Sequence, residues 1–406
     1  MSKLEELIKE FCPNGVIRVT IGKICKISRG IVMSKDFIRD NHGDYPVYSS
    51  QTENNGCLGY INTYKYDGEY VTWTTDGANA GTVFYRSGKF SITNVCGLLE
   101  VKDLMVVNTK YLYYALSIEA RRYVNQGMGN PKLMSNIMAS VQIPLPALPV
   151  QREIVRILDS FTLYSAELTA ELTARRKQYE FYRDKLLNFN QQEVEIKKLS
   201  DIFDTRNGYT PSTSNKEYWA TNDIPWFRVE DIRANGRILN DSIQHVSFSA
   251  IKGKVFPANS IIISTSATIG EHALITCESI ANQRFTYLML KDQYKDKYNI
   301  KYLFYYCFLL ADFCRENLQQ GSFASVDMSK FNKFEFPIPP IEVQERIVKV
   351  LDNFDAICSD LGIGLPAEIE KRQKQYEYYR EKLLTFDGKY ATILTERNGT
   401  ERNGQG

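Results

Sequence analysis

Short polar segments in this 406-residue chain carry the side chains best suited to contact another molecule. They are rich in Asn, Gln, Ser and Thr with an occasional Arg, and include SSQTENNG (49–56), TTDGANAG (74–81), TRNGYTPSTSN (205–215) and STSATIG (264–270). Such groups form hydrogen bonds with nucleic-acid base edges and phosphates. The same residue types also form ordinary solvated turns, and for any single loop that alternative is favoured. Because polar loops occur at matching places in both halves, the balance shifts toward nucleic-acid contacts.

The candidate nucleic-acid contacts are chosen for their position in these loops and for their donor and acceptor groups. In the first half they are Arg29, Ser50, Gln51, Asn54, Thr75, Asn79 and Asn94. In the second half they are Arg206, Asn207, Thr210, Arg228, Ser264, Thr265, Thr268, Gln283 and Arg284.

No motif for catalysis accompanies these loops. The chain has no GxxxxGK[ST] phosphate loop, no GxGxxG after a strand and no HExxH. The sequence NP at 130–131 is followed by Lys and Leu, whereas an amino-methyltransferase needs a Pro-aromatic pair there to hold a flipped base. The other candidates are histidines without metal-ligand spacing and isolated acids, namely His42, His245, His272, Asp76, Glu230 and Asp231. We therefore predict a binding protein with no catalytic residue, no metal site and no cofactor of its own.

A tandem repeat positions the polar loops. IPLPALPVQREIVRILDSF (143–161) aligns without gaps with FPIPPIEVQERIVKVLDNF (336–354), and QYEFYRDKLLNF (178–189) matches QYEYYREKLLTF (375–386) at nine of twelve positions. The helical ends of the two halves are therefore nearly identical, whereas their middles have diverged strongly. A duplicated enzyme tends to keep its chemical motifs in both copies, but a duplicated binding protein can keep its scaffold and vary what it binds.

Long helices are predicted at both ends of the repeat. Residues 151–189 contain no Pro or Gly, and a heptad seam runs through Ile154, Leu158, Phe161, Ser165, Leu168, Leu172, Arg175, Tyr179, Tyr182, Leu186 and Phe189. The second copy keeps this seam as Ile347, Leu351, Phe354, Cys358, Leu361, Ile369, Arg372, Tyr376, Tyr379, Leu383 and Phe386. GIGLP (362–366) should break or kink the second helix. We expect the two helices to pack on each other in antiparallel fashion; the alternative is that each packs only on its own domain.

The middles predict mixed α/β domains, with strand-like runs such as YVTWTT (70–75), TVFYR (82–86), SIIIST (260–265) and FTYLML (285–290). The expected fold is α+β, a pseudo-twofold tandem repeat of two mixed α/β domains separated by a long antiparallel two-helix coiled coil. The expected segments are a helix at 1–14, domains at 15–147 and 191–340, helices at 148–190 and 341–388, and a disordered low-complexity tail at 389–406. The first helix should pack beside the C-terminal helix.

Composition restricts the remaining possibilities. The net charge is +2, so any nucleic-acid affinity must come from local patches or partner subunits. No apolar run is long enough to span a membrane, and the N-terminus is too charged for a secretory signal. Eight scattered cysteines without a CxxC pair predict reduced thiols and a cytoplasmic location.

The chain resembles the specificity subunit of Type I restriction-modification systems, in the subtype whose central helix carries T-A-E-L repeats. The resemblance covers the chain up to about residue 388. It rests on VQREIVRILDSF, AELTAELTA (166–174), QYEFYRDKLL, GLPAEIEKRQKQYEYYREKLL (364–384), TRNGYTPS, IPWFRVEDIR (224–233), FPANSIIISTSATIG (256–270) and NQRF (282–285).

The resemblance implies a division of labour. Two target-recognition domains would each read one half of a bipartite, asymmetric double-stranded DNA sequence, and the helices would separate them as a ruler. Two modification subunits would bind S-adenosylmethionine and methylate adenine, and two restriction subunits would use ATP and Mg²⁺. The repeated helix ends would dock the modification subunits through Tyr179, Tyr182, Arg183, Tyr376, Tyr379 and Arg380. The tyrosines could instead serve only the intramolecular seam.

Other functions remain open from the sequence. One is the specificity subunit of a modification-only complex. A second is a self-contained DNA-modifying enzyme, against which the missing cofactor motifs argue. A third is a structural coiled-coil adaptor that does not bind nucleic acid.

Overall fold

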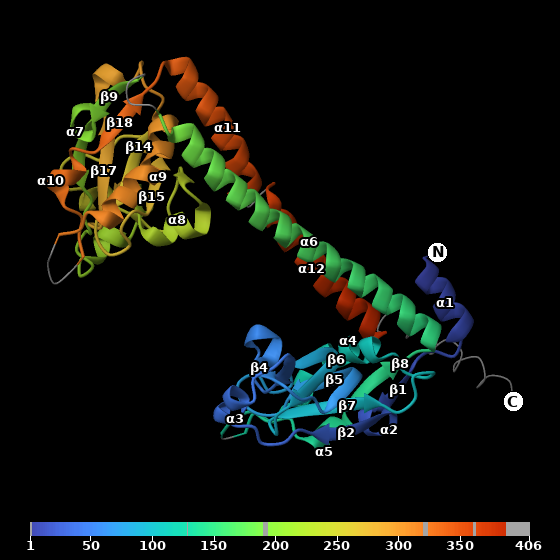
Figure 1. The fold of residues 1–406 in the computed structure, drawn as a ribbon. Coiled ribbons are helices and arrows are strands. Elements are labelled where there is room, and N and C mark those ends of the chain that lie inside the picture. Colours follow the sequence, from blue (N-terminus) through green and yellow to red (C-terminus); the bar gives the residue numbers. More distant parts are fainter. Residues whose placement is uncertain (1, 128, 190–193, 320–323, 360–362, 387–406) are drawn as a thin grey trace, which may run out of the picture. The chain divides into compact units, whose positions relative to one another are not determined.

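The computed structural model describes residues 2–127, 129–189, 194–319, 324–359 and 363–386. It divides into two compact units, of which unit 1 comprises Met1–Ala166 with Lys371–Gly406 and unit 2 comprises Glu167–Glu370 (Figure 1). The 40-residue helix α6 (Leu148–Leu187) contributes its first part to unit 1 and its second part to unit 2. The predicted disordered tail lies outside the described residues.

Unit 1 contains a six-stranded sheet in the order β2-β7-β5-β6-β3-β4. Its strands are β2 (Cys25–Arg29), β3 (Tyr45–Tyr48), β4 (Cys57–Ile61), β5 (Tyr66–Thr74), β6 (Val83–Ile92) and β7 (Cys96–Val101). A separate antiparallel pair joins β1 (Ile17–Thr20) to β8 (Gln142–Leu145). The helices and 3-10 turns are α1 (Lys3–Phe11), α2 (Ile21–Ile24), α3 (Lys35–Asp40), η1 (Glu53–Gly56), α4 (Thr109–Glu119), η2 (Ala120–Tyr123) and α5 (Ser135–Ser140).

The core of unit 1 forms where α4 packs against β5 and β6. Trp73 on β5 is fully buried, and its indole N–H donates to the Leu133 carbonyl at 2.9 Å. Gly97 on β7 leaves room for this ring, because a Cβ there would lie 2.2 Å from an indole carbon. The large aromatic residue and the glycine opposite it thus form one packing unit.

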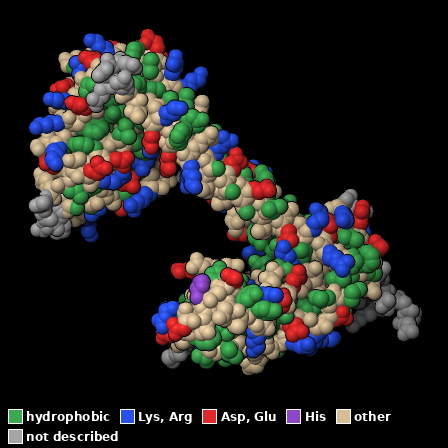
Figure 2. Space-filling view, viewed as in Figure 1, with side chains coloured by type: hydrophobic (Ala, Val, Ile, Leu, Met, Phe, Trp, Pro, Cys, Tyr) green, Lys and Arg blue, Asp and Glu red, His purple; other side chains and the backbone are tan. Residues whose placement is uncertain are grey.

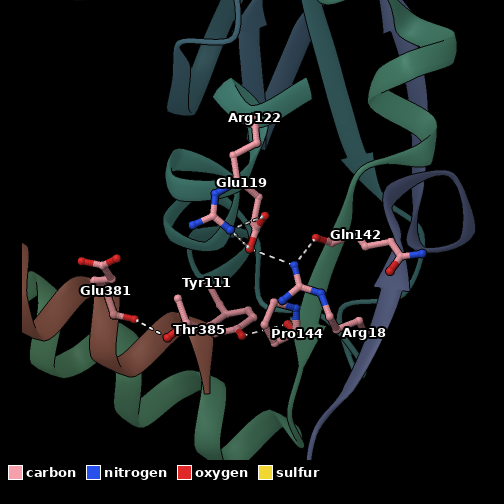
Figure 3. A network of polar contacts seen from close by, with 8 residues as sticks. All are labelled: Arg18, Tyr111, Glu119, Arg122, Gln142, Pro144, Glu381 and Thr385. Atoms are coloured by element: carbon pink, nitrogen blue, oxygen red, sulfur yellow. Dashed lines mark hydrogen bonds and ion pairs between the residues drawn. The ribbon is translucent and has the colours of Figure 1, made fainter. Parts of the chain in front are cut away.

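Polar contacts hold the β1–β8 pair against α4 and η2 (Figure 3). The Arg18 guanidinium donates to the Glu119 carboxylate at 2.8 Å and to the Gln142 carbonyl at 2.9 Å. Arg122 approaches the same carboxylate at 3.3 Å. The Glu119 side chain is only 5% exposed, and a buried carboxylate is costly unless it is paired. These two arginines compensate its charge.

Unit 2 contains a five-stranded sheet in the order β10-β17-β14-β15-β12 and a three-stranded sheet in the order β13-β11-β16. The strands are β10 (Phe203–Asn207), β11 (Ile224–Phe227), β12 (Ile238–Leu239), β13 (His245–Val246), β14 (Ser260–Ser264), β15 (His272–Ile275), β16 (Ile280–Ala281) and β17 (Phe285–Leu290). β9 (Glu195–Lys198) pairs with β18 (Glu335–Ile338), as β1 pairs with β8 in unit 1. The helices and 3-10 turns are α7 (Leu199–Ile202), η3 (Lys216–Trp219), α8 (Val229–Asn235), η4 (Phe248–Ala250), η5 (Asp292–Tyr294), α9 (Ile300–Glu316), α10 (Met328–Phe331) and α11 (Ile341–Ser359).

A buried glutamine joins the long helix to the domain in unit 1. The Gln151 side chain accepts a hydrogen bond from the Asn108 N–H at 2.8 Å. It also donates to the carbonyls of Val106 and Pro146 at 2.8 and 2.7 Å. Gln344 repeats this in unit 2, where it accepts from the Asn299 N–H at 2.9 Å and donates to the Pro339 carbonyl at 2.8 Å.

A carboxylate adds a second joint in each unit. Asp159 accepts from the Lys110 ammonium at 2.7 Å and from the Tyr114 hydroxyl at 2.6 Å. In unit 2, Asp352 accepts from Lys301 and from the Tyr305 hydroxyl at the same two distances, 2.7 and 2.6 Å. The repeated motifs NTKYLYY (108–114) and NIKYLFY (299–305) therefore encode one shared joint between domain and helix.

We predict that replacing Gln151 with alanine lowers the free energy of unfolding of unit 1 by about 3 kcal/mol, because three buried backbone groups lose their partner. Gln344→Ala should destabilise unit 2 by less, since that side chain bonds two groups. Urea unfolding followed by hydrogen exchange in each unit measures both values. Arg152→Ala, at an exposed neighbouring position, is the control. A Gln151→Ala loss no larger than that of the control would contradict the joint.

The predicted helix seam is confirmed within each unit. In unit 1, Ile154 and Leu158 share a core with Leu384 of α12 (Leu365–Thr385), and Phe161 stacks on Tyr379 with centroids 5.5 Å apart. Later residues of α12 thus meet earlier residues of α6, so the pair is antiparallel. In unit 2, Tyr182 of α6 stacks on Phe354 of α11 with centroids 5.7 Å apart. The later residue Leu187 shares a core cluster with the earlier residue Ile347, so this pair is antiparallel as well.

The predicted break in the second helix is also confirmed. α11 ends at Ser359, and α12 begins at Leu365 inside the Gly-x-Gly-x-Pro segment, directly after the non-helical residues Ile363 and Gly364; the seam position Leu361 lies outside the described residues. The short helix α1 buries Leu4 and Ile8 in the same core cluster as Leu384 of α12 and Ile154 of α6. No helix in the described parts of the chain combines the length and apolarity needed to cross a bilayer.

Candidate nucleic-acid interface

The domain at 15–147 is called domain 1 below, and the domain at 191–340 is called domain 2. Backbone hydrogen bonds bring the polar segments of domain 1 together. The Thr75 N–H donates to the Val95 carbonyl at 3.2 Å, and the Thr75 carbonyl accepts from the Leu133 N–H at 2.9 Å. Gly30 lies so close to the strand end that a Cβ would be 1.9 Å from the Ile92 carbonyl oxygen. The segments that begin at Gly30, Thr74 and Thr93 are therefore adjacent.

Domain 2 repeats this backbone arrangement. The Thr265 N–H donates to the Arg284 carbonyl, and the Thr265 carbonyl accepts from the Val326 N–H, both at 2.9 Å. A Cβ on Gly208 would lie 2.3 Å from the Ala281 carbonyl oxygen. Thr75 thus corresponds to Thr265, Gly30 to Gly208, and the residue pair 94–95 to 283–284.

Two predicted contact residues support the loops instead of facing outward. Thr75 and Ser264 are fully buried, so as DNA contacts these two predictions are wrong. The Thr75 hydroxyl accepts from the Arg29 guanidinium at 2.7 Å, and the Ser264 hydroxyl donates to the Ser266 carbonyl at 2.8 Å. Sequence reasoning could not separate them from their exposed neighbours, because both are small polar residues at strand ends.

The other predicted residues of domain 1 lie at or near the surface. Asn54, Asn79 and Asn94 are exposed, whereas Arg29, Ser50 and Gln51 are half-buried. The Asn79 amide donates to the Thr52 hydroxyl at 3.1 Å, which ties segment 74–81 to segment 49–56. Arg29 lies 3.5 Å from the Asp76 carboxylate, so part of its charge is compensated within the domain.

Segment 49–56 rests on a buried arginine that the sequence analysis missed. Arg86 is 2% exposed, with its guanidinium 3.6 Å from the Tyr48 ring centroid and its Nε donating to the Thr72 hydroxyl at 3.1 Å. Burial lowers the pKa of this guanidinium. Gly56 has a φ of +77°, and a Cβ there would lie 2.9 Å from Arg86 Nη2. The sequence signal was a lone Arg in the strand-like run TVFYR (82–86), inside β6.

In domain 2, five polar side chains form one connected group of three and one pair. The Thr286 hydroxyl donates to the Asn207 amide oxygen at 2.9 Å and lies 3.1 Å from the Thr265 hydroxyl. The Thr210 hydroxyl donates to the Gln283 amide oxygen. These contacts fix the amide orientations, so that each amide nitrogen remains directed away from its partner hydroxyl. Thr268 is half-buried, 3.5 Å from the Ser264 hydroxyl.

Three arginines of domain 2 differ in how firmly they are held. Arg206 is exposed, lies 3.9 Å from the Phe256 ring centroid and donates to the Lys254 carbonyl at 2.7 Å. Arg228 is half-buried and has its Nε buried without a hydrogen-bond partner in the described structure. Arg284 is exposed, and the described residues offer its side chain neither a hydrogen bond nor an ion pair. Arg284 is thus the arginine best placed to meet a phosphate or a guanine edge.

The histidines lack the arrangement of a metal site. His42 is exposed, and His245 pairs with Asp241 at 2.7 Å. His272 is buried between the rings of Phe304 and Phe308, and this burial lowers its pKa to about 3, so the ring is neutral at neutral pH. The described part of the chain contains no group of His, Cys, Asp and Glu side chains that could hold a metal ion.

The predicted docking residues of unit 2 are largely used within the unit. Tyr179 packs between Phe308 and Phe354 with ring centroids 6.5 and 6.2 Å away, and burial raises the pKa of its hydroxyl. The Arg183 guanidinium lies 4.6 Å from the Phe308 ring centroid. Tyr182 keeps 39% of its surface exposed.

Unit 1 repeats part of this arrangement at the corresponding residues. Tyr376 lies 6.5 Å from Phe161, and the Arg380 guanidinium lies 5.4 Å from the Tyr376 ring. Tyr379 keeps 36% of its surface exposed. Tyr179 and Tyr376 therefore serve the internal seam in part, while Tyr182 and Tyr379 reach the surface.

One repeated exposed pair was missed by the sequence analysis. Phe181 and Tyr378 occupy the same place in the repeat and are 61% and 60% exposed. Each meets the following tyrosine edge-on, with ring centroids 5.4 Å apart in both units. Each also has a lysine ammonium nearby, Lys185 at 6.0 Å and Lys382 at 5.7 Å. The chain thus presents the same aromatic and basic surface twice.

Known proteins share this sequence pattern. The model of the Type I restriction modification DNA specificity domain matches residues 13–175 and 191–371. The Escherichia coli Type I restriction enzyme EcoprrI specificity subunit is 53% identical over 214 residues, which is 50% of this chain and 53% of that protein. The E. coli EcoR124I/EcoR124II specificity subunit is 38% identical over 296 residues, covering 68% of this chain and 70% of that one.

Solved structures share the fold. The S subunit of a Type I restriction-modification system from M. genitalium has a TM-score of 0.58 and 14% identity, covering 91% of this chain and 96% of that one. A chain from a structural study of complex assembly in the type I R-M system has a TM-score of 0.61 and 15% identity, with 91% and 97% covered. Two matched domains, the helix bounds and these likenesses agree with the predicted fold class. This chain therefore belongs to the Type I restriction-modification specificity family, the non-catalytic DNA-recognition components of these systems.

Proposed function

We propose that each of the two domains reads one half of a bipartite, asymmetric duplex DNA target. The observation that carries this proposal is the shared loop scaffold, which presents different side chains in the two domains. Where domain 1 has Asn94 and Val95, domain 2 has Gln283 and Arg284 on the same backbone hydrogen bonds. Two readers of one design with different surface chemistry suit a target with two different halves.

The contacts with DNA would be local in this proposal, because the face drawn in Figure 2 carries no large field of one sign. Lys and Arg side chains are interspersed with Asp and Glu over the visible face of each unit (Figure 2). The net charge of +2 agrees with this mixture. Affinity for DNA would then depend on a few loop arginines and on partner subunits, which add their own phosphate contacts.

The repeated helix ends dock two identical modification subunits in this proposal. The exposed residues Phe181 and Tyr378, together with Tyr182, Tyr379, Arg183 and Arg380, would form equivalent surfaces. The modification subunits would hold S-adenosylmethionine, and accompanying restriction subunits would use ATP and Mg²⁺, while this chain holds no cofactor. The complex would act on cellular DNA in the cytoplasm.

Alanine at Arg284 tests the reading of DNA by domain 2. If Arg284 contacts a base edge, Arg284→Ala should cost about 1–3 kcal/mol of binding and relax the sequence requirement at one position. If it contacts a phosphate, binding to all sequences should weaken alike. The slope of the logarithm of the binding constant against the logarithm of salt concentration should then become shallower by about 1. Lys295→Ala, at a comparably exposed cation outside the loops, is the control.

Competition binding between target and random duplexes measures these effects, using the full chain with its modification subunits. Mapping methylated adenines in cells first provides the target sequence. If the Arg284→Ala variant had unchanged affinity and specificity, Arg284 and its loop would not be part of the interface. A wild-type complex that does not prefer any sequence would refute the proposed function itself.

A further inference from the structure

Domain 1 exposes two consecutive apolar side chains among its polar loops. Ile31 is 54% exposed and Val32 is 79% exposed, directly after the closely packed Gly30. Scattered exposed apolar residues are ordinary on protein surfaces. This pair differs because it stands within the group of loops that the domain would present to DNA.

An exposed amide stands next to the apolar pair. The Asn94 N–H donates to the Ile31 carbonyl at 3.0 Å, which holds the two segments side by side. The Asn94 side chain is exposed, and within the described residues it makes no hydrogen bond. One site of domain 1 therefore combines an uncommitted donor and acceptor with an adjacent aliphatic surface.

Domain 2 has different chemistry at the same place in its scaffold. The residues that follow Gly208 are Tyr209 and Thr210, where domain 1 has Ile31 and Val32. Gln283, which corresponds to Asn94, accepts a hydrogen bond from the Thr210 hydroxyl. The apolar surface beside a free amide is therefore a property of domain 1, and is not required by the shared backbone.

This combination matches one edge of an A·T base pair in the major groove. Adenine presents N7 and N6 to a side-chain amide, and thymine presents its C5 methyl group to an apolar side chain. We infer that Asn94 reads the adenine and Val32, flanked by Ile31, contacts the methyl group of the paired thymine. The inference rests on the proposed function, since it assumes that domain 1 reads DNA.

Deoxyuridine in place of thymidine tests the inference, because it removes only the methyl group and keeps the base pair. Duplexes that carry the mapped target, with each thymine replaced in turn, are titrated with the full chain in complex with its modification subunits. We expect one position in one half-site to lose about fourfold in affinity, as for one buried methyl group. Val32→Ala should abolish the loss at that position alone, and Asn94→Ala should weaken binding of the intact target at least about fivefold.

Met105→Ala is the matched control, because Met105 is 77% exposed outside these loops and should leave the uracil sensitivity intact. The inference is overturned if no thymine shows methyl sensitivity, or if Val32→Ala preserves it, while the complex still methylates its target. Absence of sequence-specific binding by the wild-type complex would instead overturn the proposed function. Unchanged melting temperatures of the variants separate both outcomes from misfolding.

Discussion

A modification complex built on a chimera in which residues 194–340 replace residues 15–147 should methylate a target with two identical half-sites. Both half-sites should be the one that the second domain reads in the natural protein. The reason is that the shared scaffold would carry the same contact residues, including Gln283 and Arg284, in both places. Sequencing of methylated adenines in cells that express the chimera measures the outcome.

The chimera should fold because both units join domain to helix in the same way. The incoming Asn299 can offer its N–H to Gln151, and the incoming Lys301 and Tyr305 can bond Asp159, since these groups already bond the corresponding residues of unit 2. The reciprocal chimera, with the first domain twice, is the control and should give the other half-site twice. Methylation at sequences unrelated to either natural half-site would contradict the model in which the two domains read DNA independently.

The architecture of this chain could be predicted because it depends on regular patterns. The heptad seam predicted α6 and its antiparallel partners, and Gly-x-Gly-x-Pro predicted the interruption that falls between Ser359 and Leu365. The joint formed by Gln151 was not predicted, although its motif was recognised as repeated. A glutamine in a polar-looking helix start gives no sign that it will be buried with three backbone partners.

The candidate site could be predicted only to the level of whole loops. Which side chain of a loop faces outward depends on backbone geometry that short polar sequences do not determine, as the burial of Thr75 and Ser264 shows. Arg86 was missed because its role comes from the fold of a segment some 30 residues earlier, where Gly56 passes over it. Val32 was not recognised as a candidate contact either, since an apolar residue in a loop is normally assigned to the core.

Alanine at both Phe181 and Tyr378 should prevent assembly with modification subunits, whereas either single substitution should leave one docking site. Both residues are about 60% exposed, and their surroundings are alike in the two units. An exposed aromatic side chain that anchors an interface typically contributes 2 kcal/mol or more, which corresponds to about 30-fold in affinity. Native mass spectrometry of the full chain mixed with modification subunits should show two bound subunits for the natural protein, one for each single variant and none for the double variant.

Tyr60→Ala is the control, because Tyr60 is 49% exposed on β4 and lies outside the repeated helix ends. The double variant should keep its melting temperature, since neither ring is part of a buried core cluster. Methyl transfer to a target duplex should fall with the number of bound subunits, because this chain has no catalytic centre of its own. If the double variant still bound two modification subunits with unchanged affinity, the partner would have to contact another face of α6 and α12, and the duplication of these aromatic residues would need a different cause.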